Sequence, residues 1–198
     1  MTPQTIAYYN QNTQSFIERT VHLDMSFSQN KFISLLSPGM RILDAGCGSG
    51  RDSKFFMEKG FAVQAMDGSE KMCQMAQEYI GQPVVCMAFE EMDWEEEFDA
   101  IWACACLLHV KKEALPKILG RFHRALKEEG IFCASFKLGD REEERLGRLF
   151  SDYHLEEIEK VFLQDGLFEL IESYETQDSR PDYKDKPWVN IIVRKTKR

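Results

Sequence analysis

Between residues 41 and 137, short apolar segments alternate with longer segments whose apolar residues recur every three or four positions. This alternation is typical of βαβ units, in which helices join parallel strands and cover both faces of the sheet. Residues 101–105 are apolar throughout, as expected for a strand buried on both sides. We therefore predict an α/β fold with strands over 41–45, 61–66, 83–87, 98–104 and 130–137, and helices over 51–59, 69–79 and 112–126.

The segments before residue 41 and after residue 137 have different sequence patterns. Residues 3–20 and 26–36 have helical spacing, and the second stretch stops at Ser37-Pro38-Gly39. Residues 139–148 are highly charged and predict a loop. A helix over 154–164 and two strand-like runs, 167–175 and 189–195, complete the chain. We predict a single domain over residues 1–198, made of an N-terminal helical lid (1–37), a core (38–138) and a C-terminal helix with an antiparallel hairpin (139–198).

Composition restricts the possible partners. The chain of 198 residues has 25 basic and 33 acidic side chains, a net charge of −8, which disfavours binding to a phosphate backbone. No apolar run is long enough to span a bilayer, and the N-terminus lacks the pattern of a signal peptide. The six cysteines include no C-x-x-C pair and no zinc spacing, so we expect free thiols, no metal and a cytoplasmic location. The oligomeric state is left open.

The most informative segment joins the first strand to the first helix. Gly46, Gly48 and Gly50 occupy alternate positions, which permits a tight turn and a close approach of the backbone to a ligand. The helix that follows presents N–H groups that attract electron-rich atoms. Asp67 ends the second strand twenty-one residues after Gly46, where a carboxylate accepts hydrogen bonds from both ribose hydroxyls of an adenosine cofactor. These two units predict a nucleoside site.

Two neighbouring residues narrow the choice of cofactor. A dinucleotide site needs a third small residue where this chain has Arg51, and no G-K-[ST] of a P-loop follows the glycines. Asp44, two residues before Gly46, would repel a pyrophosphate. The same carboxylate suits a cationic ligand such as a sulfonium that carries an amino group.

With these residues the sequence resembles the class I S-adenosylmethionine-dependent methyltransferases, from residue 42 to residue 137. The matching segments are ILDAGCGSG (42–50), AMDGS (65–69), FDAIWAC (98–104) and ALKEEG (125–130), where Glu128-Glu129 replaces the more frequent Pro-Gly. A narrower resemblance, to bacterial methyltransferases grouped with tellurite-resistance proteins, covers Tyr8-Tyr9, Phe16, Arg19-Thr20, 104–110, 135–137 and 188–190.

The resemblance implies a Rossmann-like seven-stranded mixed sheet, with the last strand antiparallel between its neighbours and helices on both faces. It implies S-adenosyl-L-methionine as cofactor and S-adenosyl-L-homocysteine as product. Phe89 would pack on the adenine and Glu90 would accept from its amino group. The expected cofactor contacts are Asp44, Ala45, Gly46, Cys47, Gly48, Ser49, Gly50, Arg51, Asp52, Asp67, Gly68, Ser69, Phe89, Glu90 and Cys104.

The acceptor side is less defined by the sequence. His109, just past the fourth strand, is the candidate general base, although a packed or capping histidine fits the same pattern. We expect substrate or lid contacts from Tyr8, Tyr9, Arg19, Lys137, Arg148 and Trp188. The predicted function is methyl transfer to a small molecule. The alternatives are an RNA (tRNA) methyltransferase and an S-adenosylmethionine-binding protein without catalysis, and the acceptor atom is open.

Overall fold

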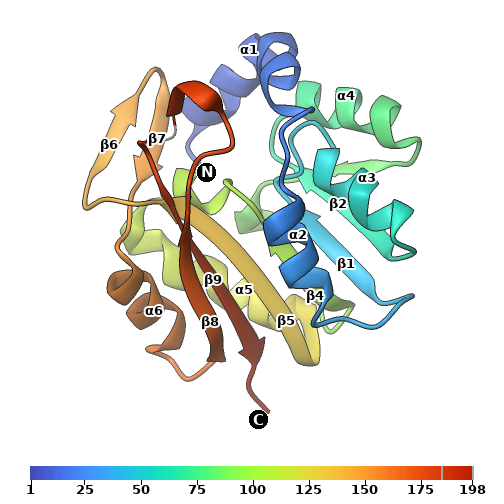
Figure 1. The fold of residues 1–198 in the computed structure, drawn as a ribbon, viewed down its shortest axis with the longest axis vertical. Helices are drawn as coiled ribbons and strands as arrows, with labels where there is room; N and C mark the ends of the chain where they lie inside the picture. The colour runs from blue at the N-terminus through green and yellow to red at the C-terminus, as the bar shows by residue number, and fades with distance from the viewer. Residues whose placement is uncertain (184, 198) are drawn as a thin grey trace.

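A seven-stranded sheet forms the centre of the computed structural model, which describes residues 1–183 and 185–197 (Figure 1). The strand order is β3-β2-β1-β4-β5-β9-β8, with β1 to β5 parallel and β9 antiparallel to both of its neighbours. The predicted mixed sheet is therefore confirmed. The strands are β1 (Arg41–Ala45), β2 (Ala62–Asp67), β3 (Val84–Cys86), β4 (Phe98–Ala103), β5 (Leu126–Lys137), β8 (Phe168–Thr176) and β9 (Trp188–Lys195).

Helices cover both faces of the sheet, because buried side chains alternate along the central strands. Leu43 and Ile101 belong to the cluster that includes Phe122 of α5 and residues of α6. Ile42 and Trp102 point the other way and pack with α2 and α3. The helices are α1 (Pro3–Thr20), α2 (Ser26–Ile33), α3 (Arg51–Glu58), α4 (Glu70–Ile80), α5 (Leu115–Ala125) and α6 (Leu155–Leu163). In the described part of the chain, no helix has the length and apolar character needed to cross a membrane.

Helix α1 lies at the top of the molecule in Figure 1, above the ends of α4 and the β6–β7 hairpin. Thr2 caps it by accepting from the Thr5 N–H, and Pro3 occupies the first helical position, where its missing N–H is not needed. The helix bends at Asn12, whose φ of −114° and ψ of 16° are not helical. This bend lets one helix follow two loops of the sheet.

The structure differs from the sequence prediction at residues 139–148, which were expected to form a loop. Glu142–Arg145 (β6) and Arg148–Ser151 (β7) pair as an antiparallel hairpin. Leu146 and Gly147, both with positive φ, form the turn between them. The prediction was wrong because β6 is charged and exposed, so its sequence has none of the apolar alternation by which a strand is recognised.

Candidate functional site

The glycine loop after β1 is shaped by close contacts with the backbone and with neighbouring side chains. The Gly46 and Cys47 N–H groups both donate to the Met66 carbonyl, at 2.8 and 2.9 Å. Gly46 has a φ of +72°, and a Cβ there would lie 2.4 Å from the Cβ of Cys106. Only glycine fits this position, as the sequence predicted from the turn.

Asp67, at the end of β2, connects this loop to the next one. Its Oδ2 accepts from the Gly48 N–H at 3.0 Å, and its Oδ1 accepts from the Ser69 N–H at 2.9 Å. Burial raises the pKa of the Asp67 carboxyl, and the backbone donors oppose that shift. The sheet therefore places a buried carboxylate beside the glycine loop, at the carboxyl ends of β1 and β2.

Two more carboxylates lie under the loop. Asp44, in β1, accepts from the Ser53 hydroxyl at 2.6 Å. Burial, together with the nearby charge of Asp52, raises the pKa of Asp44 to about 7. Asp52 accepts from the Arg51 guanidinium through both oxygens.

Asp52 also accepts from the Gln29 amide at 2.7 Å and from the Trp102 indole at 2.9 Å. Burial alone would raise the pKa of Asp52, but the Arg51 charge and these hydrogen bonds hold it below its usual range. Four donors fill the acceptor capacity of an ionised carboxylate. The Arg51–Asp52 pair therefore supports the loop from below, and the predicted contact between Asp52 and a cofactor stays a prediction.

The predicted adenine segment lies on η1 (Phe89–Glu91). Phe89 is buried against Phe122, with ring centroids 5.6 Å apart, and its ring lies 3.6 Å from a Cβ placed on Gly46. Glu90 is half exposed and accepts from the Met1 amine at 2.5 Å. Phe89 therefore lies next to the glycine loop, and Glu90 is bound to the N-terminal amine. Near it, burial raises the pKa of the Cys104 thiol to about 12, so this group is protonated at neutral pH.

Helix α1 covers both loops. A Cβ on Gly48 would lie 3.7 Å from the Phe16 ring, and one on Gly68 would lie 3.8 Å from the Ile6 side chain. Asn10 Oδ1 accepts from the Ser69 hydroxyl at 2.7 Å. Helix α1 therefore lies directly against the glycine loop and the loop that follows β2.

His109 lies on η2 (Leu107–His109), directly after β4, and is 2 % exposed. Its Nδ1 is 2.5 Å from the Leu149 carbonyl, and its Nε2 is 2.8 Å from the Tyr9 hydroxyl. A carbonyl can only accept, so Nδ1 carries the proton and Nε2 accepts from Tyr9. Burial lowers the pKa of His109 to about 4 and raises that of Tyr9 to about 12, so both groups are neutral at pH 7.

The hairpin that the sequence analysis missed completes this side of the site. Its Leu149 carbonyl orients His109, its Leu149 N–H donates to Thr5 of α1 at 3.1 Å, and its Ser151 hydroxyl donates to the Val110 carbonyl at 2.8 Å. The hairpin thus fastens α1 to η2. The only sequence signal for it was the Leu146-Gly147 turn, which is weak without flanking apolar alternation.

Of the other residues predicted on the acceptor side, Lys137 and Trp188 lie together, whereas Arg19 has a separate position. Lys137 is buried at the end of β5, pairs with Asp178 at 2.7 Å and lies 3.8 Å from the centre of the Trp188 ring. Trp188 also donates to Asp178 at 3.0 Å. Arg19 is exposed and donates to the Ser15 carbonyl of its own helix. The side chain of Arg19 therefore faces solvent, and its predicted role as a substrate or lid contact stays a prediction.

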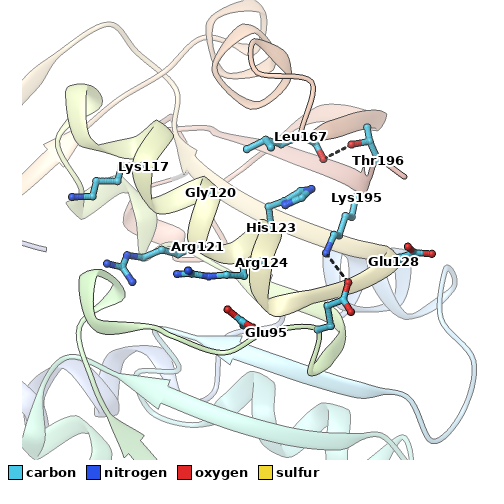
Figure 2. Close-up of a pocket in the computed structure, with 11 residues that line it drawn as sticks. Glu95, Lys117, Gly120, Arg121, His123, Arg124, Glu128, Leu167, Lys195 and Thr196 are labelled. Carbon is cyan, nitrogen blue, oxygen red and sulfur yellow. Dashed lines mark hydrogen bonds and ion pairs between the residues drawn. The ribbon is translucent and has the colours of Figure 1, made fainter. Parts of the chain in front are cut away.

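The described residues include no group of His, Cys, Asp or Glu side chains arranged to hold a metal ion. A surface pocket lies elsewhere, beside α5 and the end of β9 (Figure 2). Charged side chains of both signs line it, among them Lys117, Arg121, Arg124 and Glu128. None of the residues predicted for the site lines this pocket.

Comparison with known proteins agrees with the resemblance stated from the sequence. Residues 42–130 match a family model described as a methyltransferase domain. The match covers just under half of the chain and runs from β1 to the start of β5.

Two solved structures share the fold of this chain. Burkholderia thailandensis 1,6-didemethyltoxoflavin-N1-methyltransferase, solved with its substrate and S-adenosylhomocysteine, has a TM-score of 0.78 at 24% identity, over 97% of this chain and 85% of its own. A TehB-like S-adenosylmethionine-dependent methyltransferase of Corynebacterium glutamicum has a TM-score of 0.70 at 19% identity, over 98% and 100%. At these identities the two structures show the fold.

One curated relative of this chain is the ubiquinone biosynthesis O-methyltransferase of Rhodopseudomonas palustris. It is 33% identical over 115 residues, which are 55% of this chain and 44% of the relative. The chain spans about half the length of the first curated relatives that it matches.

The buried His109 makes the stability of the folded chain depend on pH. Its pKa is about 4 in the folded chain and about 6.5 when unfolded, so the unfolded state takes up the proton first as the pH falls. The contribution is present above pH 6.5 and is lost towards pH 4, by about 3 kcal/mol. The stability advantage of the wild type over His109→Gln should therefore shrink by about that amount.

This prediction is checked by urea unfolding of both proteins at several pH values. The raised pKa of Asp44 acts in the opposite direction over the same window, because its native form is protonated first. Since Asp44 is present in both proteins, its effect cancels in the difference. A difference that stays constant between pH 7 and pH 4 would contradict the buried neutral histidine.

Proposed function

We propose that this protein transfers a methyl group from S-adenosylmethionine to a small-molecule acceptor and releases S-adenosylhomocysteine. The observation that carries the proposal is the pairing of the buried Asp67 carboxylate with the Gly48 N–H, beside a loop in which Gly46 tolerates no side chain. A methyltransferase-domain match over residues 42–130 supports it. Relatives and structural neighbours named as small-molecule methyltransferases support the acceptor class.

The residues of the cleft fit the cofactor. The Asp67 carboxylate would bind the ribose hydroxyls, the backbone at Gly46 to Gly50 would approach the amino-acid part, and Asp44 would favour its positive charges. Phe89 and Glu90 would hold the adenine. When bound, the cofactor supplies an electrophilic methyl group on a sulfonium.

The chain's own residues then position the reactants and exclude water. Helix α1 covers the glycine loop through Phe16 and the next loop through Ile6, so it would close the cleft as the predicted lid. Tyr9 places its hydroxyl between His109 and the guanidinium of Arg148. We propose that His109 assists proton removal through this hydroxyl. A pKa of about 4 limits that role to acceptors that lose a proton readily.

The alternatives are less well supported. A tRNA methyltransferase needs a basic surface, whereas this chain has a net charge of −8. A protein that only binds the cofactor would show no methyl transfer to any acceptor. We also propose the predicted division into lid, core and C-terminal part, and a cytoplasmic location, because all six cysteines are free thiols.

Thermal unfolding with S-adenosylhomocysteine, S-adenosylmethionine, NAD and no ligand tests the proposal. A ligand at 100 times its Kd stabilises by about 2.7 kcal/mol. For a chain of this size the expected increase in Tm is about 5–10 °C. We expect this increase with both adenosyl compounds and none with NAD. No increase with either adenosyl compound at millimolar concentration would refute the proposed cofactor.

A further inference from the structure

Arg148 is a cation set among aromatic rings. It is the first residue of β7, and its guanidinium carbon lies 4.3 Å from the ring centre of Tyr8, 5.1 Å from that of Phe150 and 5.7 Å from that of Tyr9. Its Nε is buried and has no hydrogen-bond partner among the described residues. Contacts with aromatic faces hold a guanidinium in place but leave its N–H groups available to an acceptor.

The other arginine at the same end of the hairpin is bound differently. Arg145 pairs with the carboxylates of Glu143 and Asp152. For Arg148 the described part of the chain provides no carboxylate within ion-pair distance. In a protein with eight more acidic than basic side chains, a partly buried arginine without a carboxylate partner is a notable exception.

Two further cations lie on the same side of the site. Lys137 and Arg180 share one carboxylate, that of Asp178, at 2.7 and 2.6 Å. The charge of Arg180 acts on Tyr9, as does that of Arg148. Arg148, Lys137 and Arg180 therefore place three positive charges around the Tyr9 hydroxyl and Trp188. The single carboxylate of Asp178 offsets only one of them.

The opposite side of the cleft has the opposite charge. Asp44 and Asp67 lie at the glycine loop, where the cofactor is proposed to bind. The cleft is thus acidic where a sulfonium would lie and basic beyond Tyr9 and His109. Such a field favours a cationic methyl donor on one side and an anionic acceptor on the other, and the low dielectric of a covered cleft strengthens both preferences.

We propose that the methyl acceptor is a small organic anion, and that Arg148 determines this specificity by binding its carboxylate. The planar fork of a guanidinium matches a carboxylate with two parallel hydrogen bonds, and Arg148 is the group of this site whose donors are not already used by a carboxylate. The inference rests on the proposed function, since it names the acceptor class of the same site.

The test is calorimetric titration of the purified protein, with and without saturating S-adenosylhomocysteine. The probes are acetate and benzoate, each compared with its uncharged amide, acetamide and benzamide. We expect the carboxylates to bind wild type at least about tenfold more tightly than their amides. In Arg148→Gln this preference should disappear, and in Arg148→Lys it should be reduced, because lysine keeps the charge but not the fork.

Arg141→Gln is the matched control, because Arg141 precedes the same hairpin and its side chain is 72% exposed. It should keep the full preference for carboxylates. Equal binding of carboxylates and amides, absence of carboxylate binding up to about 50 mM, or an unchanged preference in Arg148→Gln would each overturn the proposal.

The same titrations separate this inference from the proposed function. If S-adenosylhomocysteine does not bind while carboxylate binding still depends on Arg148, the anion site stands and the cofactor proposal fails. If S-adenosylhomocysteine binds but no variant of Arg148 changes the binding of the carboxylates, the cofactor proposal stands and the anion site fails.

Discussion

Replacing Asp67 with alanine is expected to raise the Kd for S-adenosylhomocysteine by about a hundredfold or more. Hydrogen bonds to a charged acceptor contribute about 1.5–3 kcal/mol each, and the proposed ribose contacts use one carboxylate for two hydroxyls. The substitution also removes the acceptor of the Gly48 and Ser69 N–H groups, so the loop loses one of its connections to β2. Calorimetric titration gives the Kd, and urea unfolding gives the stability separately.

Asp165→Ala is the control for this experiment, because Asp165 is exposed and lies after α6, at the far end of the chain from the glycine loop. It should bind S-adenosylhomocysteine as wild type does. If folded Asp67→Ala also kept wild-type affinity, the nucleoside would not be anchored at the end of β2, and the central claim about the site would fail.

The second large effect is expected for Gly46→Ala. The new Cβ would lie 2.4 Å from the Cβ of Cys106 and 3.0 Å from its Sγ. The Gly46 backbone is held in place because its N–H donates to the Met66 carbonyl. The φ of +72° adds a cost of about 1–2 kcal/mol for any side chain. The overpacking adds to this conformational cost, so we expect the free energy of unfolding to fall by about 3 kcal/mol or more.

Gly60→Ala separates the two causes. Gly60 has a φ of +87°, but a Cβ there meets nothing within 4 Å, so its substitution carries the conformational cost without the clash. Urea unfolding of both variants should show a clearly larger loss for Gly46→Ala, which should also lose binding of S-adenosylhomocysteine. Equal losses in the two variants would mean that the loop relaxes around the added methyl group.

The parts of the site that depend on local chain geometry could be predicted from the sequence. The spacing of Gly46 and Asp67 is fixed by one strand, one turn and one helix, so sequence distance translates into spatial distance. The alternation of apolar segments predicted the parallel sheet for the same reason. The hydrogen bonds of Asp52 with Gln29 and Trp102 could not be predicted, because these partners come from distant parts of the chain, which no local pattern records.

The acceptor side could be predicted only in part, because three separate segments build it. Tyr9 comes from α1, His109 follows β4, and Leu149 belongs to a hairpin whose charged sequence predicted a loop. His109 was singled out by its place after β4, but its tautomer and its low pKa depend on Leu149 and on burial. Arg19 was assigned to the site by resemblance alone, and the helical position turns its side chain outward.

The β6–β7 hairpin connects β5 to the segment before α6 and forms no pairs with the seven-stranded sheet. Yet it supplies Arg148 and the carbonyl that orients His109. The groups proposed to select the acceptor therefore belong to a short hairpin, and this hairpin can change while the sheet and the glycine loop stay intact. Evolution or laboratory redesign can therefore change the methyl acceptor by exchanging this hairpin, residues 142–151, while the rest of the fold stays the same.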